Sequence, residues 1–238
     1  MEITKLLDEL LDVEITDSNY EYDGNKVPRT THILSRCIHA DQLLYWANSL
    51  GFKHQSYNKT MMVYSTIGTQ CHDNIDKFLI NHNHIPPINM EREARIAYDG
   101  FLKWWEAIHL YANSVEVVYH EKPIACKYFG GTLDGLYKIN GKLYLIDYKT
   151  SNHITFRYVL QLAAYRYILR EEYNINIDGC IILQLSKKNV GFNEYTLNFD
   201  NKNDLNYMNE CERAFLSLVY SYYNLLVVEE GYNGLNWR

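Results

Sequence analysis

The stretch KYFGGTLDGLYKINGKLYLIDYKTS, residues 127–151, decides the fold, because it contains two strand-like runs on either side of a turn signal. The dipeptide Asn-Gly at positions 140–141 is typical of a two-residue type I′ hairpin turn. Such a turn fixes the strand register. The register predicts that Asp134 on the first strand lies directly opposite Asp147 on the second.

The predicted hairpin places charges where they are costly to bury. Because side chains alternate along a strand, both aspartates and Lys149 share one face with the leucines at positions 136, 143 and 145. Two opposed carboxylates must share a proton, shift a pKa or bind a cation. We favour a cation, and carboxylate oxygens suit Mg²⁺ or Mn²⁺. The alternative is a hairpin with an exposed end, on which these charges are solvated.

The proposed cation indicates a reaction class. Lys149 beside the ion would hold or deprotonate an attacking water molecule and stabilise the charge that develops on a phosphate. The pattern therefore favours metal-assisted hydrolysis of a phosphodiester bond.

The composition is that of a globular protein. Of the 238 residues, 47% are hydrophobic and 22% are charged, which are ordinary values for a globular protein. The length predicts a single domain over residues 1–238. The net charge of −6 argues against a broadly basic nucleic-acid-binding surface, although a local groove is compatible with it. The five cysteines are scattered without CxxC spacing, so we expect a reducing compartment and no cysteine cage for a metal. We also expect no signal peptide and no membrane span.

The rest of the chain divides into a helical first part (1–113), a sheet core (114–200) and a carboxyl-terminal helical part (201–238). Apolar periodicity predicts helices at 3–12, near 40–50, from Ser65 or Thr66 to about 80, at 90–112, at 156–173 and at 203–229. The polar stretch 16–29 is interpreted as a loop. Further strands are predicted from residue 115, near 178–186 and at 192–199. This order describes an α/β sandwich with a central sheet covered on both faces.

Four segments together resemble a known family. GGTLDG (130–135), LIDYKTS (145–151) and QLAAYRYIL (161–169) follow STIGTQCHDNIDKFL (65–79) in the order found in the PD-(D/E)XK nuclease superfamily. The resemblance covers roughly residues 27–185 and is to the RecB-like branch, with most likeness to phage exonucleases and the mitochondrial genome maintenance exonuclease. It implies the αβββαβ core of that superfamily, with a mixed sheet flanked by helices and a helical amino-terminal half.

The resemblance also implies roles for particular residues. Asp134 and Asp147 would bind the metal, with His72 and Tyr148 as further metal-binding positions, and Lys149 would be the catalytic lysine. Glu121 in HEKPIA would support the metal or its water, although Glu116 is an alternative. The implied substrate-binding positions are Gln161, Tyr165, Thr150 and Ser151. For His72 a plain surface or core position is the alternative, and Gln161 with Tyr165 would otherwise be a polar pair at a helix surface.

The function implied by the resemblance is a Mg²⁺- or Mn²⁺-dependent DNA exonuclease that prefers single-stranded ends. The alternatives are a structure-specific endonuclease of flaps or branched DNA and a non-catalytic nucleic-acid-binding module. Members of this branch that bind an iron–sulfur cluster typically have three of its four cysteine ligands near the carboxyl terminus. This chain has only Cys211 after Cys180, so we expect no such cluster. The expected partners are DNA and replication or recombination proteins, and the expected location is the cytoplasm of a bacterium or phage-infected cell, with an organelle matrix as the alternative. Candidates for a DNA groove are Arg29, Lys53, His54, Lys59, Arg92, Arg95 and Arg166.

Overall fold

A five-stranded mixed sheet forms the centre of the protein, for which a computed structural model describes residues 19–39 and 41–233. The strands lie in the order β3-β4-β5-β6-β7, and all neighbours are antiparallel except the parallel pair β5 and β6. Their bounds are β3 (Val115–Cys126), β4 (Phe129–Ile139), β5 (Lys142–Lys149), β6 (Gly179–Leu185) and β7 (Phe192–Asn198). The predicted α/β class with a mixed central sheet is confirmed.

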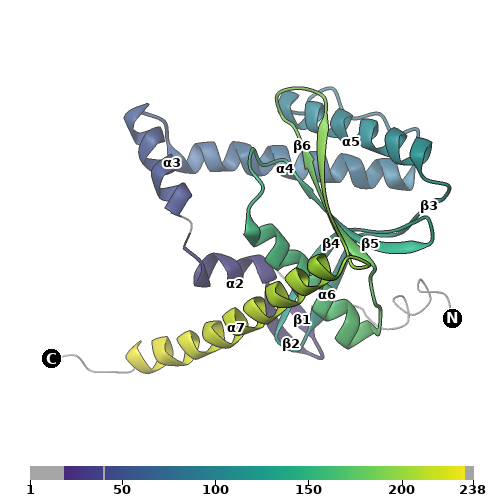
Figure 1. Cartoon of the computed structure of the whole chain (residues 1–238). Coiled ribbons are helices and arrows are strands. Elements are labelled where there is room, and N and C mark those ends of the chain that lie inside the picture. The colour runs from purple at the N-terminus through teal and green to yellow at the C-terminus, as the bar shows by residue number, and fades with distance from the viewer. Residues whose placement is uncertain (1–18, 40, 234–238) are drawn as a thin grey trace.

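Helices cover both faces of this sheet (Figure 1). On one face, α4 (Tyr57–Ile80) and α5 (Arg92–Tyr111) pack against inward-facing residues of β4, β5 and β6 in one apolar core. On the other face, α2 (Thr30–Cys37), α6 (Phe156–Tyr173) and α7 (Lys202–Asn233) enclose a second core. The segment from α5 to β6 follows the predicted order of helix, three strands, helix and strand.

The hairpin between β4 and β5 has the predicted register. Ile139 pairs with Lys142, and the pairing continues to Gly135 and Ile146. The turn residues Asn140 and Gly141 have φ values of 51° and 82°, as the left-handed conformations of a type I′ turn require.

The regular pairing stops just before the two aspartates. Asp134 and Asp147 are next in register, but the carboxylate of Asp134 accepts a hydrogen bond from the backbone N–H of Tyr148 at 2.7 Å instead. A side chain therefore takes the place of the next ladder bond. The two carboxylates have separate hydrogen-bond partners, since Asp134 accepts from Tyr148 N and Asp147 from Lys149 Nζ.

Two predictions in the amino-terminal half are wrong. The stretch interpreted as a loop contains a hairpin of β1 (Asn19–Tyr22) and β2 (Asn25–Pro28), which turns at Asp23 and Gly24. The helix predicted to begin at Ser65 or Thr66 begins instead after Ser56, whose side chain accepts a hydrogen bond from Lys59 N and caps α4. The additional turns of α4 expose apolar side chains and therefore lack the core-facing periodicity on which the prediction depended.

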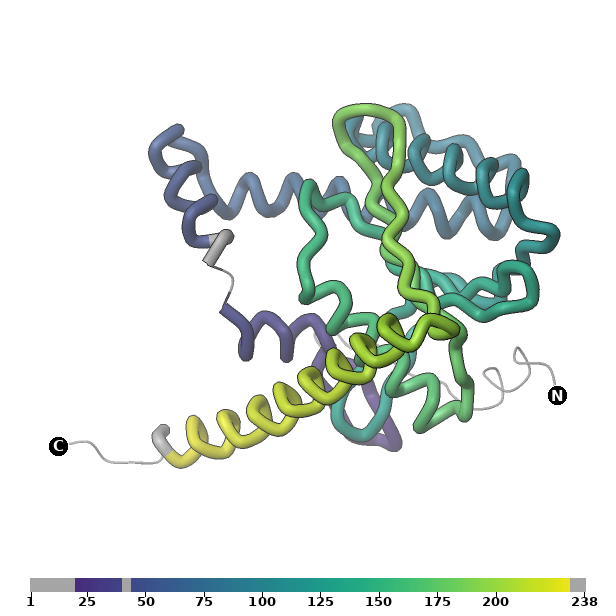
Figure 2. The backbone as a smooth tube through the Cα atoms, in the orientation of Figure 1, coloured from purple at the N-terminus to yellow at the C-terminus, as the bar shows by residue number. Residues whose placement is uncertain are grey.

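The helices predicted at 90–112, 156–173 and 203–229 correspond closely to α5, α6 and α7, whereas α2 was not predicted. Helix α3 (Asp41–Phe52) lies where a helix was expected near 40–50, and it stands away from the sheet (Figure 2). The helix predicted for residues 3–12 lies outside the described residues. Within the part of the chain that the structure describes, no helix combines the length and apolar character needed to cross a membrane.

Candidate metal centre

Three side chains from separate elements meet at one end of the sheet. His72 comes from α4, Glu121 from β3 and Asp134 from β4, and one potential ligand atom of each lies within 4.8 Å of the others. His72 Nδ1 is 3.3 Å from Glu121 Oε1 and 3.7 Å from Asp134 Oδ1. The chain therefore gathers an imidazole and two carboxylates that are widely separated in sequence.

An unusual backbone conformation places Glu121 in this cluster. Its φ of 43° lies in the left-handed region, which costs a residue with a side chain about 1–3 kcal/mol. The strand pairs on both sides of Glu121 are formed, whereas Glu121 itself makes no ladder pair with Asp134 opposite it. Such strain persists where the surrounding structure enforces it, and it is concentrated at functional sites.

The structure also separates the two glutamates that the sequence left as alternatives. Glu116 pairs with Lys138 farther along β3 and is not part of the cluster. Glu121 is therefore the glutamate of β3 that lies beside His72.

His72 is held between acceptors on both ring nitrogens. Its Nε2 lies 3.2 Å from the carbonyl oxygen of Tyr148, and its ring meets the Tyr148 ring edge-on at 5.7 Å. Burial opposes protonation, but the charge of Asp134 and the hydrogen bond with Glu121 outweigh it and raise the pKa of His72 to about 9. The surroundings of His72 thus favour a positively charged imidazole beside the two carboxylates.

Asp147 and Lys149 form an ion pair beside these residues. Lys149 Nζ donates to Asp147 Oδ1 at 2.6 Å, and the Asp147 side chain is only 2% exposed. Burial raises the pKa of Asp147 to about 6, with Lys149 opposing this effect and Asp134 adding to it. The lysine also lies 5.1 Å from the centre of the Tyr158 ring.

Lys149 Nζ contacts both oxygens of the buried carboxylate. It also lies 2.6 Å from Asp147 Oδ2, although among the described residues that oxygen has no partner with hydrogen-bond geometry. The negative charge of Asp134 acts on the same carboxylate, and a further cation between the two would stabilise both charges. The donor set of carboxylate oxygens and one imidazole therefore fits a divalent metal ion such as Mn²⁺ or Mg²⁺.

Gln161 and Tyr165 lie buried next to the carboxylates rather than on a helix surface. Gln161 Nε2 donates to Tyr165 Oη at 3.1 Å, and both side chains are buried. Burial raises the pKa of Tyr165, and the charges of Asp134 and Asp147 raise it further. The alternative of a polar pair at a helix surface is therefore excluded, while a role in substrate binding remains a prediction.

Thr150 and Ser151, the predicted substrate-binding residues that directly follow β5, lie in a loop that passes α4. A Cβ added at Gly68 would lie 3.7 Å from Thr150 Oγ1, so the helix approaches the loop closely there without requiring glycine. Ser151 is anchored through its backbone, since its carbonyl accepts from Gln184 Nε2 at 2.8 Å. Its hydroxyl donates to the carbonyl of His153.

The predicted groove residues have different surroundings. Arg166 donates to Glu212 at 2.9 Å and Arg95 to Asp99 at 3.1 Å, so both are engaged within the chain. The guanidinium of Arg29 lies 5.7 Å from the centre of the Tyr20 ring. Lys53, His54 and Lys59 are exposed near the junction of α3 and α4, and Arg92 lines a basic pocket at the start of α5.

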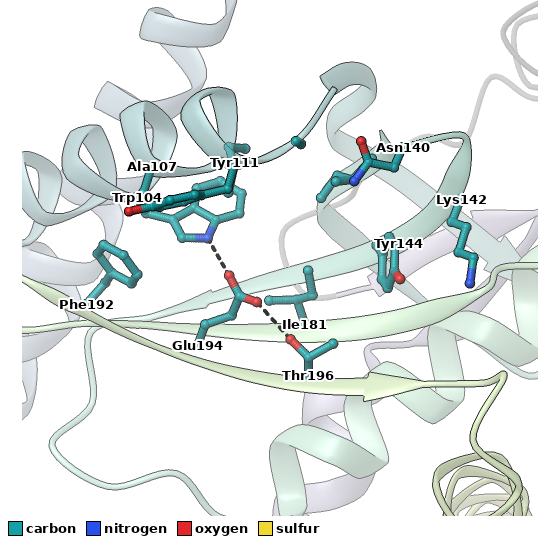
Figure 3. Close-up of a pocket in the computed structure, with 13 residues that line it drawn as sticks. Trp104, Ala107, Tyr111, Asn140, Lys142, Tyr144, Ile181, Phe192, Glu194 and Thr196 are labelled. Carbon is teal, nitrogen blue, oxygen red and sulfur yellow. Dashed lines mark hydrogen bonds between the residues drawn. The ribbon is translucent and has the colours of Figure 1, made fainter. Parts of the chain in front are cut away.

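An apolar cavity of about 630 Å³ lies at the opposite end of β5, near the turn of the hairpin (Figure 3). Its carboxylate, Glu194, accepts hydrogen bonds from Trp104 Nε1 at 2.7 Å and Thr196 Oγ1 at 2.9 Å. Lys142, which also lines it, is five residues before Asp147, or roughly 17 Å along a strand. The cavity is thus separate from the candidate metal centre.

Comparisons with known proteins leave the family open. No protein-family model and no curated protein matches the chain. A solved structure described as "Crystal structure of SSO0001" matches over 60% of this chain and 80% of its own, with 16% identity and a TM-score of 0.25. A similarity this low supports no conclusion about fold or activity.

Proposed function

We propose that this protein is a metal-dependent deoxyribonuclease of the PD-(D/E)XK superfamily that acts preferentially on single-stranded ends. The observation that supports it best is the convergence of His72, Glu121 and Asp134 beside the ion pair of Asp147 and Lys149. Acidic ligands next to a buried lysine suit hydrolysis of a phosphodiester, in which negative charge develops on a phosphate.

The residues divide into two roles in this proposal. Asp134, Asp147, Glu121 and His72 would hold the cation, together with the carbonyl oxygen of Tyr148. A divalent ion at such a site supplies a Lewis acid for a phosphate oxygen and lowers the pKa of bound water. Lys149 would orient the attacking water and stabilise the charge on the phosphate, and Asp147 fixes its ammonium group in position.

The preference for DNA ends derives from the resemblance of the motifs at 65–79, 130–135, 145–151 and 161–169. A single strand would reach the site past the exposed aromatic and basic side chains near α3 and the first half of α4. An endonuclease of branched DNA and a non-catalytic binding module are the alternatives.

A gel time course with end-labelled linear and circular single strands tests the proposal. With Mg²⁺ or Mn²⁺ we expect the linear strand to shorten and the circle to remain intact, and with EDTA we expect neither to change. Cleavage of the circle would favour the endonuclease. Absence of cleavage by the wild type and Lys149→Ala alike, with DNA still bound, would favour the binding module.

A further inference from the structure

A basic pocket of about 340 Å³ lies between α4, α5 and the loops that follow β5 and β6. It is distinct from both the apolar cavity and the candidate metal centre. The residues that line it are Tyr64, Arg92, Glu93, Ile96, Asn152, Lys187 and Lys188. Three cations and one carboxylate give the pocket a positive charge in a chain whose net charge is −6.

In the described part of the chain, the cations of this pocket have no acidic partner at salt-bridge distance, and Lys187 Nζ lies 4.5 Å from the centre of the Tyr64 ring. Many other surface cations are paired with a carboxylate. Burial lowers the pKa of Lys187, and the charge of Glu93 only partly opposes this effect. An anion in the pocket would stabilise these charges.

The loop that carries the two lysines is held in place. The hydroxyl of Ser186 accepts hydrogen bonds from the backbone N–H groups of Lys188 and Asn189, each at 3.3 Å. Gly100 of α5 allows the loop to approach, because a Cβ there would lie 2.6 Å from the carbonyl oxygen of Gly191. The pocket is therefore preorganised, which limits the entropy lost on binding.

The pocket lies at the same edge of the sheet as the candidate metal centre. Lys149 pairs with Gln184 on the parallel strand, so both loops leave from the carboxyl ends of neighbouring strands. On α4, Tyr64 precedes His72 by eight residues, which corresponds to about 12 Å along the helix. One extended ligand can therefore occupy both places.

An aromatic row beside the pocket indicates what that ligand is. The Trp46 ring contacts the rings of Tyr57 and Tyr64 at centroid distances of 5.5 and 5.9 Å. Tyr57 is 37% and Tyr64 42% exposed. Lys187 Nζ lies over the Tyr64 ring at 4.5 Å, so a base would stack on the parts of these rings that the lysine leaves open. Cations without an acidic partner next to exposed aromatic rings are typical of sites for single-stranded nucleic acid.

We propose that the pocket formed by Arg92, Lys187 and Lys188 binds a backbone phosphate of a single DNA strand whose scissile bond lies at the metal centre. The bases beyond that phosphate would stack on the row of Trp46, Tyr57 and Tyr64. This inference rests on the proposed nuclease function and adds a second point of attachment for the strand.

The test compares Lys187→Gln/Lys188→Gln with Lys138→Gln/Lys202→Gln, a control with the same change in charge near the other end of the sheet. Fluorescence anisotropy of a labelled oligothymidylate in EDTA measures binding without cleavage. We expect the pocket variant to lose about tenfold in affinity, and its log–log salt slope to fall by about 0.7, the contribution of one neutralised phosphate on a single strand. The control should match the wild type.

Cleavage rates separate this inference from the proposed function. At saturating strand with Mn²⁺, the pocket variant should keep the wild-type kcat and show a raised KM. Equal affinities and salt slopes for the pocket variant and the control would overturn the inference, as would an equal loss of affinity for a blunt duplex. If the wild type binds the strand but does not cleave it with any metal, the proposed function fails, while weaker binding by the pocket variant would still support the pocket.

Discussion

Lys149 donates a hydrogen bond to the buried carboxylate of Asp147, two residues earlier on the same strand, at 2.6 Å. Residues two apart on a strand point to the same face, so a DxK sequence is sufficient to form this contact once the strand exists. The pair is thus formed locally, whereas His72, Glu121 and Asp134 must be brought beside it by the tertiary fold.

The variant Lys149→Ala should abolish cleavage, with a loss of about a hundredfold or more, because a positioned group next to the reacting phosphate is removed. DNA binding should persist. Stability should also fall, since an uncompensated buried charge costs about 3–5 kcal/mol. Single-turnover cleavage, DNA binding and thermal unfolding measure these effects. Lys149→Arg keeps the charge beside Asp147 and serves as the folded control, and full activity of Lys149→Ala would refute the mechanism.

The variant Asp134→Asn should weaken Mn²⁺ binding by about tenfold or more, because it removes a charged ligand. Its amide oxygen can still accept the hydrogen bond from Tyr148 N, so the fold should be retained. Isothermal titration calorimetry measures the affinity, and circular dichroism checks the fold. An unchanged Mn²⁺ affinity would show that the carboxylate of Asp134 is not a ligand.

His72 should make the site selective between metals. Mn²⁺ accepts an imidazole nitrogen readily, whereas Mg²⁺ strongly prefers oxygen. We therefore expect the wild type to bind Mn²⁺ more tightly than Mg²⁺, and His72→Ala to lose affinity mainly for Mn²⁺. Calorimetric titrations of both proteins with each ion test this, and equal losses for the two ions would contradict a ligand role for His72.

The two hairpins show how far turn chemistry alone predicts the fold. Asn-Gly at 140–141 lies between long apolar runs, and both the turn and the register follow from it. Asp23-Gly24 has the same left-handed backbone, but the strands around it are short and largely polar, with Tyr20, Val27 and Pro28 buried. The weak alternation conceals this hairpin in the sequence.

From the residue pattern alone the composition of the candidate site was predictable only where it is local, whereas His72 and Glu121 were expected from the family resemblance. Asp147 and Lys149 follow from the strand period, but the preference for Glu121 over Glu116 depends on a left-handed residue within β3. No propensity predicts that conformation for glutamate. The basic pocket was likewise missed at Lys187 and Lys188, because their proximity to Arg92 depends on how the β6–β7 loop packs on α5.

The position of the Tyr165 ring should require glycine at position 131. A Cβ at position 131 would lie 2.2 Å from Tyr165 Cε1. The ring cannot move away freely, because it is buried and its hydroxyl accepts a hydrogen bond from Gln161. We expect Gly131→Ala to destabilise the protein by about 1–3 kcal/mol through overpacking. Urea unfolding measures this against Gly191→Ala, where an added Cβ meets open space.

A second substitution identifies the ring as the cause of that cost. In the Tyr165→Leu background the clash is relieved, so Gly131→Ala should cost less there than in the wild type, by an amount that a double-mutant cycle measures. Tyr165 itself lies in the electrostatic field of Asp134 and Asp147, so a displacement of its ring also changes the surroundings of these two carboxylates. Equal stability of Gly131→Ala and Gly191→Ala would mean that the Tyr165 ring does not depend on the glycine, and that α6 is not held against β4 at this point.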